Sequence, residues 1–281
     1  MRYKVFDVFA QKPFEGNPTG IVYADRPLET ELMQRLANEL ALRDTIFLLP
    51  KSRPELLFTS RTFTPNQELE ICGQGLVGAI WSLLDDYEIP SGRHTVETAI
   101  GPRGVVVERG ETTSVLCSLG KPVVTELPPE DRERIEKLLA SRQIRSDRTA
   151  FVELGRKRLL AQVTPSELEQ AELEPAAVVE TCRALKVTGI VLCTTGSDLE
   201  PARSRHFTTS LKGTEDPVTG GAAAAILAFY RDADQRLEQL QVYQGGFSTR
   251  GGLMLARTDS SKGEVWIGGN AVKISEGEIL L

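Results

Sequence analysis

The chain has 281 residues, of which 41% are hydrophobic and 26% are charged, an ordinary composition for a globular protein. The net charge of −6 argues against nucleic acid or an anionic membrane as the main partner, because both require a basic surface. No run approaches the roughly eighteen apolar residues of a membrane helix, and the N-terminus lacks an apolar signal core. We therefore expect a cytoplasmic protein.

Strand-like segments are spread along the whole chain, as alternating or β-branched runs separated by turns rich in Gly, Pro or Asn. These runs predict strands at 3–9, 45–49, 56–63, 95–100, 104–110, 114–119, 189–195, 240–244, 253–257 and 264–269. Helical spacing of apolar residues and helix-start signals predict helices at 28–42, 75–87, 129–142, 164–173, 176–185 and 221–232. Two of them, 75–87 and 221–232, are apolar nearly all round, so we expect strands to wrap them.

These two apolar helices belong to a repeat. Each follows an R-x-F-T tetrad, a short polar loop and a glycine-rich turn, and the tetrads begin at Arg61 and Arg205, 144 residues apart. The tetrad, loop, turn and helix recur in the same order about half the chain length later, which indicates a domain duplication. We predict an α+β fold of two pseudo-symmetric domains, each a β-barrel around a central helix. The domains would comprise residues 1–118 with about 270–281, and residues 119–269.

Glycines stand at the start of each central helix: Gly73 and Gly75 in the first half, Gly220 and Gly221 in the second. The first turn of a helix has unsatisfied N–H groups and partial positive charge, and glycine lets an anion approach the backbone. The matched pair predicts a pocket for a small carboxylate. The simpler alternative is that these glycines only allow tight turns and close packing.

The cysteines do not indicate a metal site. Cys72, Cys117, Cys182 and Cys193 form no C-x-x-C pair, and the chain has only two histidines, so we expect no metal. Free cysteine is among the most buried residue types, so the last three are interpreted as core residues. Cys72 is different, because it directly precedes the first glycine-rich helix start.

Six segments, taken in order, resemble the signature of the PhzF-like isomerases, relatives of diaminopimelate epimerase. They are F-E-G-N-P-T-G-I-V from Phe14, L-A-N-E-L-A-L-R-D-T-I-F from Leu36, R-T-F-T-P from Arg61, I-C-G-Q-G from Ile71, E-D-P-V-T-G-G-A from Glu215, and Y-Q-G from Tyr243 with R-G from Arg250. The resemblance implies two barrel domains with the site between them, no metal and no organic cofactor, and a homodimer. The best-known activity of the family is isomerisation of dihydro-3-hydroxyanthranilate by a proton shift.

The resemblance also implies roles for individual residues, with three departures. Asp44 stands where the family has a catalytic glutamate, Gln74 where it usually has histidine, and Gly221 where it has serine. A glutamine can hydrogen-bond but cannot titrate. Asp216 keeps the aspartate of the family motif D-P-V-T-G-S. In this interpretation Asp44 carries the proton, while Gln74 and Asp216 orient polar groups of the substrate.

Substrate binding would then fall to the segments around these three residues. Backbone N–H groups at Gly75, Gly220 and Gly221 would hold a carboxylate. The same site would include Gly73 and Thr219, and Asn17 of G-N-P-T would form part of its wall. Arg61 and Arg205 are expected to pair with acids, and His206, beside an aromatic residue in a strand, is expected to be packed.

The leading hypothesis is a cofactor-independent isomerase or epimerase that moves a proton on a small carboxylate-bearing metabolite. Two alternatives stay open. One is a non-catalytic paralogue that binds small carboxylates. The other is a thiol-based racemase using Cys72, since "CGQG" resembles the turn of two-thiol epimerases and a helix N-terminus lowers a thiol pKa. The corresponding turn in the second half has no cysteine, which disfavours the thiol alternative.

Overall fold

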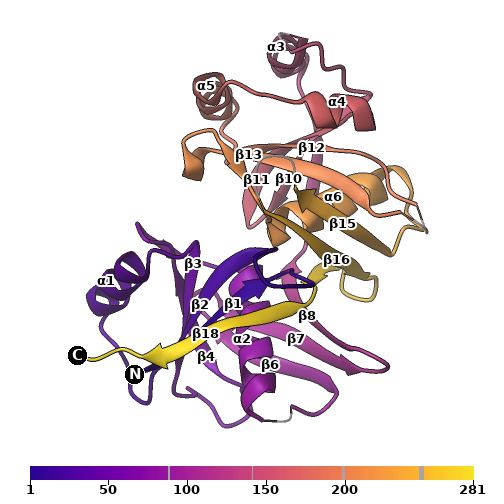
Figure 1. Ribbon diagram of the computed structural model, residues 1–281. Helices are drawn as coiled ribbons and strands as arrows, with labels where there is room; N and C mark the ends of the chain where they lie inside the picture. Colours follow the sequence, from indigo (N-terminus) through magenta and orange to yellow (C-terminus); the bar gives the residue numbers. More distant parts are fainter. Residues whose placement is uncertain (88, 141, 198–199, 247–249) are drawn as a thin grey trace. The chain divides into compact units, whose positions relative to one another are not determined.

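The computed structural model describes residues 1–87, 89–140, 142–197, 200–246 and 250–281, and in these ranges the chain forms two compact units. Unit 1 consists of Met1–Leu119 with Ile267–Leu281, and unit 2 of Gly120–Trp266. Each unit is a curled mixed sheet that packs on one buried helix, with further helices on the outside (Figure 1). The predicted α+β class, with two similar halves, is confirmed.

Unit 1 is built from nine strands. They are β1 (Arg2–Val8), β2 (Asn17–Tyr23), β3 (Asp44–Leu49), β4 (Thr59–Phe63), β5 (Glu68–Leu69), β6 (Gly92–Thr98), β7 (Gly101–Arg109), β8 (Thr113–Gly120) and β18 (Ala271–Glu278). Strand β1 pairs antiparallel with β18 and with β2, and β2 pairs parallel with β3. Strand β4 pairs antiparallel with β3 and β5 and parallel with β6, and β6, β7 and β8 continue antiparallel.

Helix α2 (Gly73–Asp86) is the central helix of unit 1 and packs against β1, β2, β3 and β18. Apolar residues on different sides of this helix are buried, including Leu76, Val77 and Ile80. Helix α1 (Thr30–Leu40) lies outside the sheet, where Met33, Leu36 and Ala37 form a second core with residues of β2, β3 and β4. The sequence predicted both helices because burial on all sides and burial on one side give different patterns.

Unit 2 repeats this arrangement. Its strands are β9 (Val123–Glu126), β10 (Arg148–Leu154), β11 (Arg156–Gln162), β12 (Gly189–Cys193), β13 (Ala202–Thr208), β14 (Glu215–Asp216), β15 (Gln239–Gly245), β16 (Gly251–Asp259) and β17 (Glu264–Gly268). Strand β10 pairs antiparallel with β9 and β11, and β11 pairs parallel with β12. Strand β13 pairs antiparallel with β12 and β14 and parallel with β15, which is followed by antiparallel β16.

Helix α6 (Gly220–Ala233) is the central helix of unit 2 and packs against β9, β10, β11, β15 and β16. The alanines from Ala222 to Ala225 are fully buried, which explains why only small side chains occur there. Helices α3 (Pro129–Ala140), α4 (Pro165–Gln170) and α5 (Pro175–Leu185) lie outside the sheet in Figure 1 and contribute to a second core. Residue 141 of the predicted helix 129–142 lies outside the described residues.

The two R-x-F-T tetrads form equivalent ion pairs in the two units. Arg61 of β4 forms an ion pair of 2.6 Å with Glu68 of β5, and Arg205 of β13 forms one of 2.7 Å with Glu215 of β14. Each guanidinium also lies 5.3 Å from the ring of the phenylalanine two residues later. The expected pairing of both arginines with acids is therefore confirmed, and the pairs fix the short strand that precedes each central helix.

Several strands were not predicted from the sequence. Strand β2 begins with Asn-Pro, β11 with Arg-Lys-Arg, and β18 is largely polar, so none shows the alternation expected of a half-buried strand. Asn17, in a segment for which no strand was predicted, is the first residue of β2. Pairing with neighbours overrides weak local preference in strands. None of the helices in the described ranges is long and apolar enough to span a bilayer.

Replacing a central-helix alanine by a larger residue should destabilise unit 2. Ala224→Leu adds volume where the side chain is fully buried, so we expect a loss of about 1–3 kcal/mol in the free energy of unfolding. Ala233→Leu lies on the same helix at an exposed position and should change stability by less than about 0.5 kcal/mol. Urea unfolding followed by circular dichroism compares the two, and equal losses would contradict the buried position of α6.

Candidate active site

The N-terminus of α2 is capped by a cysteine. Cys72 is the N-cap residue, in extended conformation (φ −138°, ψ 105°), and its Sγ accepts the N–H of Gly75 at 3.3 Å. Gly73 fits tightly, because a Cβ there would lie 2.9 Å from the side chain of Ile267. The predicted glycine-rich helix start is therefore a capped turn with a half-buried thiol at its tip.

Asp44 lies beside this cap. It is the first residue of β3, pairs in register with Thr19 of β2, and only 6% of its surface is exposed. The thiol of Cys72 donates to Oδ2 of Asp44 at 3.5 Å. The structure thus places a buried carboxylate against the first turn of a helix, where the helix dipole favours negative charge.

Gln74 is directed into unit 1 toward β2. Its side-chain Nε2 donates to Oγ1 of Thr19 at 2.6 Å and to the carbonyl oxygen of Asn17 at 3.5 Å. Asn17 therefore meets Gln74 through its backbone rather than its side chain. Four of the predicted site residues, Asn17, Asp44, Cys72 and Gln74, come together at this helix end, and Thr19, which sequence reasoning missed, joins them.

The N-terminus of α6 has the same backbone but a different cap. Thr219 is the N-cap residue with nearly the dihedrals of Cys72 (φ −135°, ψ 104°), yet its side chain caps no N–H of the helix. Instead its hydroxyl donates to Oδ2 of Asp216 at 2.8 Å. Asp216 is itself buried, so the predicted aspartate and threonine form a hydrogen-bonded pair in front of the helix.

Two further residues complete this network and were not assigned to the site from sequence. Nδ1 of His206 lies 3.0 Å from Oγ1 of Thr219, and Nε2 of Gln244 donates to the same oxygen at 3.2 Å and to the carbonyl of Asp216 at 2.8 Å. Because the single hydroxyl proton of Thr219 goes to Asp216, Nδ1 of His206 must be the protonated nitrogen. His206 is buried, as expected, but as part of a polar network rather than a packed core.

A buried arginine also reaches the first turn of α6. Arg158 of β11 is 6% exposed, and Nη1 donates to the carbonyl of Arg156 at 3.1 Å. A Cβ on Gly221 would lie 2.8 Å from Nη2 of Arg158. Burial lowers the pKa of Arg158 to about 10, with a further decrease from Arg156 and an opposing increase from Asp216. The group remains a cation at neutral pH. In the sequence it stands in an Arg-Lys-Arg run that is typical of a solvated surface.

The other three cysteines lie in apolar surroundings. Burial raises the pKa of Cys117, Cys182 and Cys193 to about 12 in each case. Cys193 is on β12, with its thiol directed at the carbonyl of Ala161, so it does not stand at the start of α6. Within the described ranges no group of three or more His, Cys, Asp or Glu side chains is arranged to hold a metal ion.

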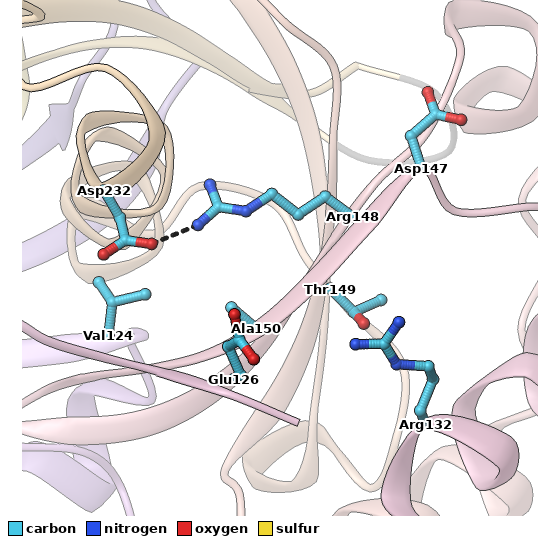
Figure 2. A pocket seen from close by; sticks show the side chains of 8 residues that line it. All are labelled: Val124, Glu126, Arg132, Asp147, Arg148, Thr149, Ala150 and Asp232. Carbon is cyan, nitrogen blue, oxygen red and sulfur yellow. Dashed lines mark hydrogen bonds and ion pairs between the residues drawn. The ribbon is translucent and has the colours of Figure 1, made fainter. Parts of the chain in front are cut away.

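A cavity of unit 2 is a separate feature. It has a volume of about 300 Å³ and is lined by Val124, Glu126, Arg132, Asp147, Arg148, Thr149, Ala150 and Asp232. Figure 2 shows the guanidinium of Arg148 directed at Asp232, with which it pairs at 2.5 Å. Asp232 belongs to the last turn of α6, the end opposite Thr219. None of the predicted site residues lines this cavity.

Comparison with known proteins places this geometry in a class. Among solved structures, the chain resembles a PhzF-family phenazine biosynthesis protein of Bacillus anthracis (TM-score 0.84, 24% identity, 100% of this chain and 99% of that one). It also resembles a hydroxyproline epimerase of Agrobacterium vitis (TM-score 0.62, 14% identity, 99% and 91%). At these identities the likeness establishes the fold, which is that of the PhzF-like isomerases and the related epimerases and racemases.

Sequence comparison then defines the family. The model for phenazine biosynthesis-like proteins matches residues 6–277. The chain is 29% identical over 300 residues to trans-2,3-dihydro-3-hydroxyanthranilate isomerase of Pseudomonas aeruginosa, covering 100% of this chain and 99% of the relative. It is 27% identical over 303 residues to phenazine biosynthesis-like domain-containing protein 1 of Mus musculus, covering 99% of each. The protein therefore belongs to the PhzF family of isomerases, as its motifs indicated.

The cysteine environments predict a selective thiol reaction. A thiol with a pKa of about 12 is ionised to roughly one part in ten thousand at pH 8, so Cys117, Cys182 and Cys193 should stay unreactive in the folded protein. Ellman's reagent should titrate one thiol rapidly, Cys72, and all four after denaturation. The variant Cys72→Ser should show no rapid reaction. Two or more rapid thiols in the native wild-type protein would contradict these environments.

Proposed function

We propose that this protein is a cofactor-independent isomerase or epimerase that moves a proton on a small carboxylate-bearing metabolite, with Asp44 as the proton carrier. The supporting observation is the buried Asp44 carboxylate, 3.5 Å from the Cys72 thiol at the start of α2, in a chain whose relatives include a named isomerase. A carboxylate can take a proton from one carbon and return it to another when it is held in a dry, fixed position.

The surroundings of Asp44 suit this role. Its backbone is fixed by the parallel pairing of β3 with β2, and one carboxylate oxygen is held by the Cys72 thiol. Proton transfer requires placement to a fraction of an ångström, which a strand start packed against a capped helix can supply. The second oxygen of the carboxylate would face the substrate. Gln74, held by Thr19, would orient a polar group of the substrate without titrating.

The proposal keeps the family expectation that the two helix starts contact the same substrate. Asp216 and Thr219 would then contribute hydrogen bonds from the start of α6, and the first-turn N–H groups of Gly220 and Gly221 would bind the carboxylate. The substrate named for the Pseudomonas relative is not carried over, because Gln74 cannot transfer a proton where the family usually has histidine. Homodimer formation and a cytoplasmic location stay predictions from the sequence.

A binding protein without catalysis is the second candidate. Gln74 and Gly221 favour it, since both stand where the family has residues able to exchange or donate protons. The thiol-based alternative is less well supported. Cys72 has a partner carboxylate, but the matching cap position in unit 2 is Thr219, whose hydroxyl is not acidic enough to replace a thiol.

Exchange of substrate protons with solvent tests the catalytic role. Small cyclic and unsaturated carboxylic acids are incubated with the protein in deuterated water, and incorporation is measured by mass spectrometry. Asp44→Asn should reduce incorporation by about 10²–10⁴-fold, because it removes the base while keeping shape. Asp44→Glu, which restores the family residue, and Cys72→Ser should retain exchange.

The outcomes separate the three candidates. Thermal stabilisation by an acid with no exchange in the wild-type protein supports the binding paralogue. Loss of exchange in Cys72→Ser, with retention in Asp44→Asn, supports the thiol mechanism and would sink the role proposed for Asp44.

A further inference from the structure

The strand registers align the two units residue by residue. In unit 1, Thr45 pairs with Gly20 of β2 and with Phe63 of β4. In unit 2, Ile190 pairs with Leu159 of β11 and with Phe207 of β13. Since Phe63 and Phe207 are the third residues of the two R-x-F-T tetrads, Gly20 corresponds to Leu159. The residue before each also corresponds, so Thr19 of unit 1 occupies the place of Arg158 in unit 2.

The helix caps extend this correspondence. Cys72 and Thr219 are N-cap residues with the same backbone conformation, so the residues two positions later, Gln74 and Gly221, are equivalent. In unit 1 the long side chain comes from the helix and the short one from the strand, and Gln74 meets Thr19 at 2.6 Å.

In unit 2 the sizes of the two side chains are reversed. The helix residue is Gly221, and the strand residue Arg158 extends its guanidinium to within 2.8 Å of where a Cβ of Gly221 would be. A neutral amide–hydroxyl contact at the start of α2 is therefore replaced by a cation at the start of α6. Glycine at position 221 allows the guanidinium to lie here, because a side chain there would displace Nη2.

The hydrogen bonding of Arg158 and of the helix is incomplete in the same place. Nε of Arg158 is buried without a hydrogen-bond partner among the described residues, and the side chain is more than nine-tenths buried. The first turn of α6 receives no side-chain cap, whereas Cys72 caps Gly75 in α2. A buried cation and an uncapped helix N-terminus both favour an anion, and here the guanidinium lies beside the first turn of the helix.

The charged groups around Arg158 favour the binding of one further anion. Asp216 is the adjacent carboxylate; one of its oxygens accepts the hydroxyl of Thr219, and the same oxygen lies 3.9 Å from Nδ1 of His206. Asp216 opposes the charge of Arg158, and Arg156 adds a second positive charge nearby. A substrate carboxylate against Arg158 would therefore enter a region with a surplus of cations.

We propose that Arg158 is a further ligand-binding residue, whose guanidinium contacts a carboxylate held at the first turn of α6. The ligand class is a monocarboxylate attached to a small ring or unsaturated chain. The assignment to substrate rests on the proposed isomerase function, whereas binding of the carboxylate itself can be measured without any reaction.

The test compares anthranilate with anthranilamide, which differ by the charge of one group, by isothermal titration calorimetry on the full chain. The wild-type protein should bind anthranilate at least tenfold more tightly. Arg158→Thr should abolish this preference, and Arg158→Lys should retain part of it. Arg156→Thr removes the more exposed of the two positive charges and should weaken the preference less than Arg158→Thr does. A wild-type protein that binds neither compound, or both equally, overturns the proposal.

Folding and binding are separated by a second variant and a second measurement. Arg158→Thr with Gly221→Gln copies the Thr19–Gln74 pair of unit 1, so it should fold, as judged by circular dichroism, and still lack the preference for anthranilate. In the ¹⁵N-labelled wild-type protein, the Nε–H resonance of Arg158 should shift on addition of anthranilate but not of anthranilamide. An unchanged resonance contradicts the assignment, because a purely structural arginine would not respond.

Failure of this inference and failure of the isomerase proposal give different results. Asp44→Asn should lose solvent exchange but keep anthranilate affinity within about threefold. An Arg158-dependent preference without exchange in the wild-type protein supports the anion site and rejects catalysis. Exchange that persists in Arg158→Thr with unchanged KM for the substrate rejects the anion site and leaves catalysis standing.

Discussion

Each unit depends on a helix that is buried along most of its length and begins among polar groups. The first N–H groups of such a helix lack partners within it, so the surrounding strands must supply acceptors or leave space for a ligand. Unit 1 supplies an acceptor, the Cys72 sulfur, and holds the thiol with Asp44. Unit 2 supplies none from its cap residue, because Thr219 is committed to Asp216. The polar residues assigned to the site are arranged around these two differently capped helix N-termini.

Duplication explains why the two helix starts can diverge in chemistry while keeping the same backbone. Equivalent strand registers place Thr19 and Arg158 in the same position, and equivalent caps do so for Gln74 and Gly221. A large residue on one element requires a small one on the other, because the space between helix and strand is fixed. The two helix starts therefore differ in charge and in the sizes of both side chains, while the ion pairs of Arg61 and Arg205 are alike in the two units.

Part of the grouping of the candidate site residues could be predicted from sequence. Asp44, Gln74 and Asp216 were identified through ordered motifs, and the structure places Asp44 and Gln74 at the start of α2 and Asp216 at the start of α6. Thr19, His206 and Gln244 were not assigned to the site, because each lies in an ordinary strand pattern and acquires its role only from a partner distant in sequence. Arg158 was missed because an Arg-Lys-Arg run looks like a solvated surface, whereas strand alternation turns the third of these residues toward α6.

By itself the sequence determined the two buried helices, the duplication and the family, because these depend on local periodicity and on motifs that keep their order. Only the tertiary structure decided which polar groups meet at each helix start. Strand register sets those contacts, and a shift of one residue would turn every side chain of a strand to the other face. That register, invisible in local composition, is what brings the Arg158 guanidinium to Gly221 and the Gln74 amide to Thr19.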